Sequence, residues 1–154
     1  MSGSGMLADF RRGKKALCRS QPHKTRKSDS RKAEEIKAYM KVKGVDISAL
    51  AYYPNMLDPD EEKRRTYVEH LYRLIDASAL LDVNMVTTFL GRIPNQSVSH
   101  NLEEVKKVWP PILEYAQTKG VRIAIENCPM LFTEDEWPGG QNLMTTPANW
   151  RKSV

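Results

Sequence analysis

The feature that most constrains the fold is a regular alternation of two sequence patterns that begins at Ala33. Segments with apolar residues at helical spacing alternate with short segments rich in β-branched residues. The helical pattern covers 33–43, 58–81 and 101–120, and the strand pattern covers 45–53, 85–89 and 121–126. Helices and strands that alternate at these lengths favour parallel βαβ units. The predicted fold class is therefore α/β, either an open doubly wound sheet or part of a (β/α)8 barrel.

Local signals predict where these elements begin and end. Asn101 suits a helix cap, and Gly120 suits the end of the same helix. The Pro110–Pro111 pair has no backbone N–H groups, so a break in this helix is expected there. Thr146–Pro147 indicates the start of a further helix. No glycine-rich phosphate-binding motif follows a strand, which disfavours a nucleotide-binding sheet.

Basic charge is concentrated at the start of the chain. Residues 1–45 hold 13 of the 24 Lys and Arg residues but only 4 of the 19 Asp and Glu residues, whereas residues 46–154 hold 11 and 15. A disordered basic leader is expected over 1–32 and one domain over 33–154, because the leader has few apolar residues to bury. The leader could contact nucleic acid, act as a targeting signal or be a solvated tail. Because neither a secretory signal nor an apolar run of membrane-spanning length is found, a cytoplasmic protein without a membrane partner is expected.

Polar residues that follow the predicted strands are the candidates for a functional site, because ligands of parallel sheets bind at the carboxyl ends of the strands. Glu126 ends the third strand, on the face of Ala124 and opposite Ile123 and Ile125. If the isoleucines pack against helices, Glu126 points into the mouth of a barrel, where a carboxylate is costly unless it meets a cation or hydrogen-bond donors. Glu126 is therefore predicted to be a metal ligand or a general base, or otherwise the ion-pair partner of an Arg or Lys.

Three further residues are candidates for contact with a substrate. Arg92 has the donor geometry to bind a phosphate or carboxylate, although it could also be a solvated loop residue or a partner of Glu126. Asn55 and Asn127 could bind sugar hydroxyls, although asparagine is also common in turns. His70 lies within a predicted helix and is expected to be structural.

Several of these segments together resemble a known family. They are Ser48–Asn55, Phe89–Arg92, Trp109–Ala116, Ile123–Met130 and Trp137–Leu143. From about Ala33 to Arg151 the chain resembles the sugar phosphate isomerase/epimerase group, the xylose-isomerase-like TIM barrels. The resemblance implies a barrel with a divalent metal ion (Mn, Mg, Zn or Co) at its mouth, held by Glu, Asp, His and Glu from successive strands. Glu126 corresponds to the first of these ligands, and carboxylates or a His would move protons during isomerisation.

The chain is shorter than the complete barrel that the resemblance implies. Without the leader about 120 residues remain, against roughly 250 for a complete barrel, and they correspond to strands three to five. The expected function is that of a sugar or sugar phosphate isomerase/epimerase domain. Because the other metal ligands would lie on later strands, weak or no activity is expected from this chain.

Three alternatives stay open beside this interpretation. A relative of the endonuclease-IV-like AP endonucleases would act on abasic DNA, but the acidic balance of the body disfavours nucleic acid as a partner. A truncated, non-catalytic fragment would expose strand edges and self-associate through them. A homo-oligomer that closes a barrel from two chains would supply only further copies of Glu126.

Overall fold

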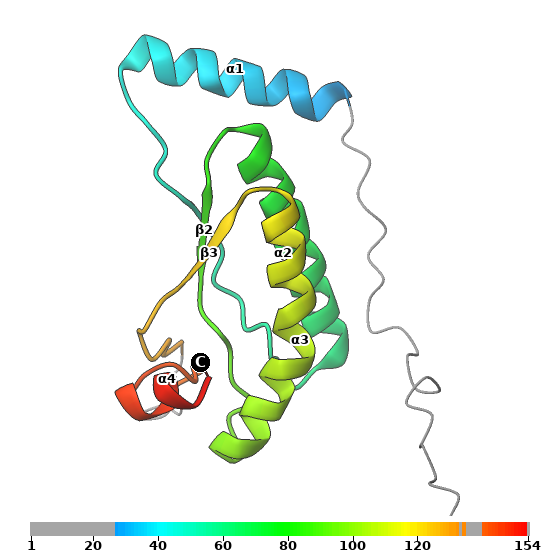
Figure 1. Ribbon diagram of the computed structural model, residues 1–154, viewed down its shortest axis with the longest axis vertical. Coiled ribbons are helices and arrows are strands. Elements are labelled where there is room, and N and C mark those ends of the chain that lie inside the picture. Colours follow the sequence, from blue (N-terminus) through cyan, green and yellow to red (C-terminus); the bar gives the residue numbers. More distant parts are fainter. Residues whose placement is uncertain (1–26, 133, 135–139, 154) are drawn as a thin grey trace, which may run out of the picture.

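The computed structural model describes residues 27–132, 134 and 140–153, which form an α/β fold (Figure 1). In chain order the elements are α1 (Lys27–Lys43), β1 (Leu50–Ala51), α2 (Glu61–Leu80), β2 (Met85–Thr88), α3 (Val98–Thr118), β3 (Arg122–Ile125) and α4 (Pro147–Ser153). The predicted alternation of helices and strands is confirmed. In the described part of the chain, no helix is both long and apolar enough to cross a membrane.

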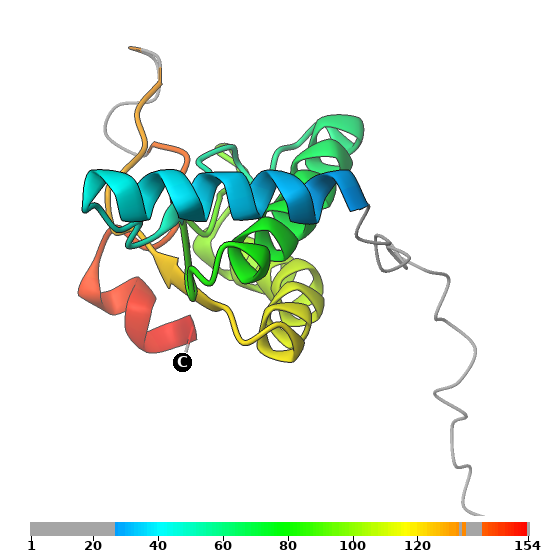
Figure 2. The ribbon, with the colours of Figure 1, turned by 90° about the horizontal axis from the view of Figure 1, so that it is seen from above.

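The three strands form one parallel sheet in the order β1-β2-β3. Thr87 in the central strand pairs with Ala51 on one side and with Ala124 on the other. Helices α2 and α3 lie side by side against one face of this sheet (Figures 1 and 2). The arrangement is that of a partial TIM barrel, as the sequence predicts. No described strand pairs with the outer edges of β1 and β3, and self-association through these edges stays a prediction.

The apolar core lies between the sheet and the two helices. The apolar residues at helical spacing on which α2 was predicted include Leu71 and Ile75, and both are fully buried. From α3, Ile112 is fully buried, and the Trp109 indole Nε1–H donates to the Leu90 carbonyl at 2.9 Å. Burial of such side chains is the main source of stability, at about 1.5–3 kcal/mol for each. Helices α2 and α3 therefore cover one face of the sheet only (Figure 2).

Helix α1 lies across the end of the sheet where the strands begin (Figure 1). Its Lys37 ammonium is 2.6 Å from the Glu34 carboxylate and 3.0 Å from that of Asp82, which follows α2. The helix begins at Lys27, six residues before the expected start at Ala33, so the predicted boundary of the leader at residue 32 falls within a helix. The other predictions for the leader concern residues 1–26, which lie outside the described residues.

Two predictions for α3 are wrong. The helix is capped by Ser97, whose Oγ accepts from the His100 N–H at 3.1 Å, whereas Asn101 lies inside the first turn. The Pro110–Pro111 pair does not interrupt the helix, which runs through both residues. Proline has no N–H to donate to the carbonyl four residues earlier in a helix. Both prolines are exposed, so water can bind these two carbonyls instead. The strands are also shorter than predicted, most clearly β1, which keeps two residues of the expected 45–53.

Candidate functional site

A pocket of about 320 Å³ lies where β2 and β3 end, on the side where ligands of parallel sheets bind. We call it the strand-end pocket. It is lined by Thr87, Ala124, Ile125, Glu126, Asn127 and Trp150. Glu126 follows β3 directly and its backbone N–H donates to the Thr88 carbonyl at 2.7 Å, so the carboxylate is carried by the end of the sheet. The two predicted residues Glu126 and Asn127 are thereby brought together, and both are exposed to solvent.

The inward orientation of Glu126 stays a prediction, on which the packing of its neighbours bears. Ile123 and Ile125 pack against the apolar cluster beneath α2 and α3, and both Ala124 and Ile125 line the strand-end pocket together with Glu126. Thr87 is the partner of Ala124 in the sheet and lines the same pocket. Its Oγ1 accepts a hydrogen bond from the Tyr53 hydroxyl at 3.2 Å. Its Oγ1 also donates to the Leu50 carbonyl at 3.5 Å. Three polar residues, Thr87, Glu126 and Asn127, therefore line one pocket.

Asn55, at the end of the first strand segment, joins two loops in the structure. Its side chain is 4% exposed, and Nδ2 donates to the Arg92 carbonyl at 2.7 Å. Its Oδ1 accepts from the backbone N–H groups of Leu57 at 2.9 Å and Arg92 at 3.0 Å. Gly91 permits this close approach, since a Cβ there would lie 2.5 Å from Asn55 Oδ1. A substrate contact by Asn55 stays a prediction, and it would have to use the second hydrogen of Nδ2.

Arg92 is half-buried and does not line the strand-end pocket. Its Nη2 donates to the Pro94 carbonyl at 3.3 Å, within its own loop. The structure therefore places Arg92 beside Asn55 through their backbone and side-chain bonds, and Arg92 is not among the described residues that line the strand-end pocket. Binding of an anionic substrate group by Arg92 stays a prediction.

Asn142 is a buried residue that was not predicted from the sequence. It is 1% exposed and binds the loop that carries Glu126. Its Nδ2 donates to the carbonyls of Glu126 and Cys128, each at 2.8 Å, and its Oδ1 accepts from the Met144 N–H at 3.1 Å. The signal available in the sequence was a polar residue directly before an apolar pair in the Asn142–Met144 run. That signal does not reveal the partners, because they lie 14 and 16 positions earlier in the chain.

Comparison with known proteins gives the family. The sequence model of the xylose isomerase-like TIM barrel family matches residues 16–150. The chain belongs to this family. The crystal structure of protein SMc04130 from Sinorhizobium meliloti 1021 has the same type of fold, with a TM-score of 0.53 at 17% sequence identity. The match covers 79% of this chain and 43% of that protein, so the chain spans less than half of its structural relative. The comparison with curated proteins gave no match.

Within a xylose isomerase-like TIM barrel, the strand-end pocket corresponds to the mouth of the barrel. The described residues contain no group of three or more His, Cys, Asp or Glu side chains that could hold a metal ion. Among the described residues that line the pocket, Glu126 is the only charged one, and a divalent cation takes several oxygen or nitrogen ligands. The donors that the structure describes therefore do not by themselves form the metal site of such a barrel.

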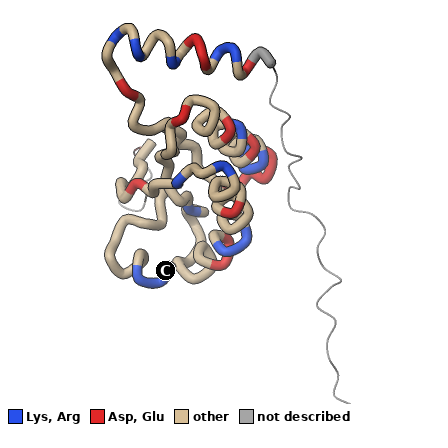
Figure 3. The backbone as a smooth tube through the Cα atoms, turned by 45° about the horizontal axis from the view of Figure 1, so that its top comes forward, with Lys and Arg blue, Asp and Glu red and all other residues tan. Residues whose placement is uncertain are grey.

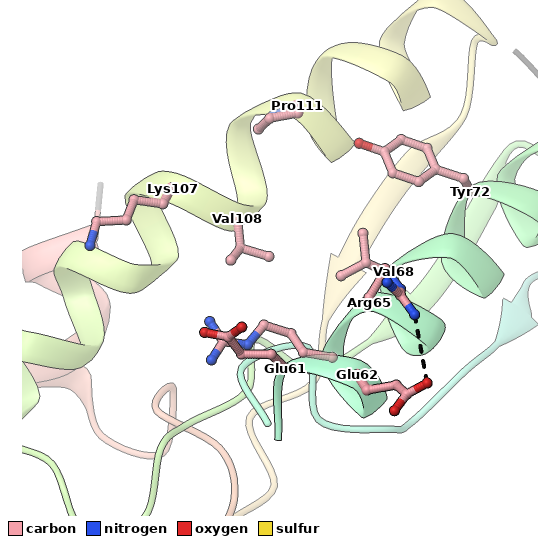
Figure 4. Close-up of a pocket in the computed structure, with 9 residues that line it drawn as sticks. Glu61, Glu62, Arg65, Val68, Tyr72, Lys107, Val108 and Pro111 are labelled. Atoms are coloured by element: carbon pink, nitrogen blue, oxygen red, sulfur yellow. Dashed lines mark ion pairs between the residues drawn. The ribbon is translucent and has the colours of Figure 1, made fainter. Parts of the chain in front are cut away.

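A larger pocket of about 580 Å³ lies in the helical layer, between the start of α2 and the middle of α3 (Figure 4). Its cations are paired with carboxylates: Arg65 with Glu62 at 3.7 Å, and Arg64 and Lys107 with Glu104 at 3.3 Å and 2.6 Å. The hydrogen bond from Lys107 and the charges of Lys107 and Arg64 lower the pKa of Glu104, although burial opposes them. In a TIM barrel this seam belongs to the outer ring of helices, so we assign it to helix packing.

Proposed function

We propose that the strand-end pocket binds a sugar or sugar phosphate, and that the chain contributes this pocket to a barrel of the isomerase/epimerase type. The supporting observation is the placement of Glu126 beside Asn127 and Thr87 at the carboxyl ends of β2 and β3 in a xylose isomerase-like TIM barrel. A polyhydroxylated ligand matches these groups, because each of its hydroxyls both donates and accepts hydrogen bonds. The activity of a whole barrel is part of the proposal, since the chain spans 43% of its structural relative.

Glu126 has the central role in this proposal. Its carboxylate accepts a hydrogen bond from a sugar hydroxyl, or takes a proton from the hydroxyl-bearing carbon next to the sugar carbonyl and returns it to the former carbonyl carbon, while the proton of that hydroxyl moves to the former carbonyl oxygen. Asn127 donates its amide hydrogens to hydroxyl or carbonyl oxygens and so orients the sugar. The Thr87 hydroxyl offers a third polar contact from the floor of the pocket.

A divalent metal ion in the complete barrel would polarise the carbonyl or hydroxyl of the sugar. Glu126 would be one of its ligands, and the others would come from residues outside the described set. We therefore expect weak or no turnover from the 154-residue polypeptide with Mn²⁺ or Mg²⁺. Robust turnover that Glu126→Ala abolishes would contradict this expectation.

The binding proposal is tested by NMR titration of the ¹⁵N-labelled chain with D-xylose and with D-fructose 6-phosphate. The expected result is saturable shifts at the amides of Thr87, Glu126 and Asn127, with affinity reduced about tenfold or more in Glu126→Gln. Loss of a charge-assisted hydrogen bond of about 1.5–3 kcal/mol corresponds to such a reduction. Glu114→Gln is the matched control, because Glu114 is an exposed carboxylate on α3 outside the pocket.

Two outcomes of this titration would contradict the proposal. One is an affinity that Glu126→Gln and Glu114→Gln change equally, or shifts that map to the helical layer. The other is the same pocket shifts with a duplex that contains an abasic site and none with either sugar, which would favour the DNA-repair alternative. Figure 3 shows Lys and Arg interspersed with Asp and Glu along α1, α2 and α3, and such mixed charge disfavours a nucleic-acid interface on these helices.

A further inference from the structure

The segment 140–144 lies against the loop 126–130 that follows β3. Gln141 N–H donates to the Met130 carbonyl at 3.1 Å, and Asn142 N–H donates to the Pro129 carbonyl at 3.2 Å. The approach is so close that a Cβ on Gly140 would lie 2.0 Å from the Pro129 oxygen. Gly140 also has a φ of +61°, in the left-handed region that glycine enters without strain. Two segments separated in sequence are thus held as one unit at the edge of the strand-end pocket.

The side chain of Asn142 adds two hydrogen bonds at the point in this loop where the pocket residues lie. Its Nδ2 donates to the carbonyls of Glu126 and Cys128, which stand on either side of Asn127. The Glu126 carbonyl belongs to the peptide plane that joins Glu126 to Asn127, and the Cys128 carbonyl belongs to the plane that joins Cys128 to Pro129. The plane before Glu126 is held by its own N–H, which donates to the Thr88 carbonyl. Glu126 therefore lies between two held peptide planes, and Asn127 lies in the short segment between the two carbonyls that Asn142 binds. The amide is suited to this position since Oδ1 also accepts from the Met144 N–H.

A second buried asparagine extends the network to the other strands. Leu143 N–H donates to the Gly91 carbonyl at 3.2 Å, which ties the segment 140–144 to the loop after β2. Asn55 in turn ties the loop after β2 to the loop after β1 through Arg92 and Leu57. A continuous path of hydrogen bonds therefore joins the ends of all three strands.

We infer that Asn142 is a positioning residue that holds Glu126 and Asn127 in the geometry needed to bind a sugar. The inference rests on the proposed function, because it gives the loop 126–130 a task only if Glu126 and Asn127 bind the ligand. Asn142 does not line the pocket and acts through the backbone carbonyls that it binds. Positioning of this kind matters because small displacements of a binding group reduce affinity and rate.

Asn101 supplies a matched control for Asn142. It is also an asparagine, it is 0% exposed, and its side chain is saturated by backbone groups. Its Oδ1 accepts from the Ile93 N–H at 2.7 Å, and its Nδ2 donates to the Ile93, Gln96 and Ser97 carbonyls. These partners belong to the loop before α3, so removal of Asn101 costs buried hydrogen bonds without touching the loop 126–130.

The experiment compares backbone ¹⁵N relaxation of the full chain with that of Asn142→Ala and Asn101→Ala, without ligand. In the wild type, order parameters of about 0.85 are expected at the amides of Glu126, Asn127 and Cys128. In Asn142→Ala they are expected to fall below about 0.6 at these amides and to stay high in β2 and β3. Asn101→Ala is expected to leave them unchanged. If Asn142→Ala does not fold, Asn142→Ser is measured by the same criteria, because it keeps a hydroxyl at the position.

A rigid loop in Asn142→Ala, or equal loosening in both variants, would overturn the inference. Titration of both variants with D-fructose 6-phosphate then adds the functional readout, with affinity expected to weaken about tenfold or more in Asn142→Ala and to be retained in Asn101→Ala. Because the relaxation data need no ligand, the two proposals fail separately. If the wild type binds neither sugar but the loop loosens in Asn142→Ala, the proposed function is wrong. The structural effect of Asn142 on the loop is then still confirmed.

Discussion

The helical layer and the strand-end loops are held together by different interactions. Beneath α2 and α3, fully buried apolar side chains such as Leu71, Ile75 and Ile112 fill the space against the sheet. At the strand ends, buried polar side chains bind backbone groups, as Asn55 and Asn142 do. Apolar packing tolerates many sequences of similar volume, whereas an asparagine with three backbone partners tolerates few replacements. The stability of the fold and the geometry of the pocket should therefore respond to different substitutions.

The largest effect is expected in the helical layer. Ile112→Ala should lower the free energy of unfolding by about 2–5 kcal/mol, because it removes a fully buried side chain and leaves a cavity. Leu113→Ala, at the next position of α3, should change it by less than about 0.5 kcal/mol, since Leu113 is 47% exposed. Urea denaturation followed by circular dichroism measures both. Similar losses in the two variants would mean that α3 does not pack with this face toward the sheet.

The next largest effect on the free energy of unfolding is expected from a glycine substitution in the strand-end loops. Gly91→Ala should cost about 2–3 kcal/mol, because its φ of +91° strains an L-residue and the new Cβ would collide with the Asn55 side chain. Gly120→Ala is the control with a φ of +69° and no atom within 4 Å of the added Cβ, so it should cost about 1–2 kcal/mol from backbone strain alone. Equal losses by urea denaturation would show that the contact between Gly91 and Asn55 does not matter.

The two asparagines predicted from the sequence should differ in the same assay. Asn55→Ala should lower the free energy of unfolding by about 1–3 kcal/mol, because it leaves the Arg92 and Leu57 backbone groups without their partner. Asn127→Ala should have an effect below about 0.5 kcal/mol, since Asn127 is exposed, and should instead weaken sugar binding. The reverse order of stabilities would contradict the assignment of Asn55 to loop positioning.

The smallest effect is expected in the pH dependence of the helical seam. The pKa of Glu104 is lowered by its hydrogen bond to Lys107, so ionised Glu104 stabilises the folded state above its unfolded pKa of about 4.5. This contribution, at most about 1 kcal/mol, should be lost as the pH falls through the folded pKa. The stability difference between wild type and Glu104→Gln should therefore shrink as the pH falls from 7 to 3. A difference that stays constant over this range would mean that charge does not cause it.

The sequence predicted the parts of the structure that depend on local pattern. The apolar spacing of α2 placed Leu71 and Ile75 in the core, and the alternation in β3 placed Ile123 and Ile125 against the apolar cluster. Both predictions follow from the repeat of the backbone, which sets which side chains share a face. The fold class followed from the same patterns.

The remaining features depend on contacts between distant residues. Asn101 was predicted to cap α3, yet its Oδ1 accepts a hydrogen bond from the Ile93 N–H, and Ser97 is the cap. Pro110 was predicted to interrupt α3, yet the helix continues through it. Pro110 is exposed, so water can bind the carbonyl to which it donates no N–H. The role of Asn142 could not be predicted, because its partners in the loop after β3 are brought to it only by the folded chain. Capping, interruption and positioning are each decided by which groups meet in space.

The central claim is that the strand-end loops can open without the core. Native-state amide hydrogen exchange in Asn55→Ala tests it most directly. The informative amides are those of Leu143, which donates to Gly91 among the strand-end loops, and Arg122, which donates to Asn84 at the opposite end of the sheet. If the loops form one hydrogen-bonded unit, exchange at Leu143 should accelerate about tenfold or more, equivalent to about 1.4 kcal/mol, with little change at Arg122. Equal acceleration at both amides would show that core and pocket open together, and would contradict the account.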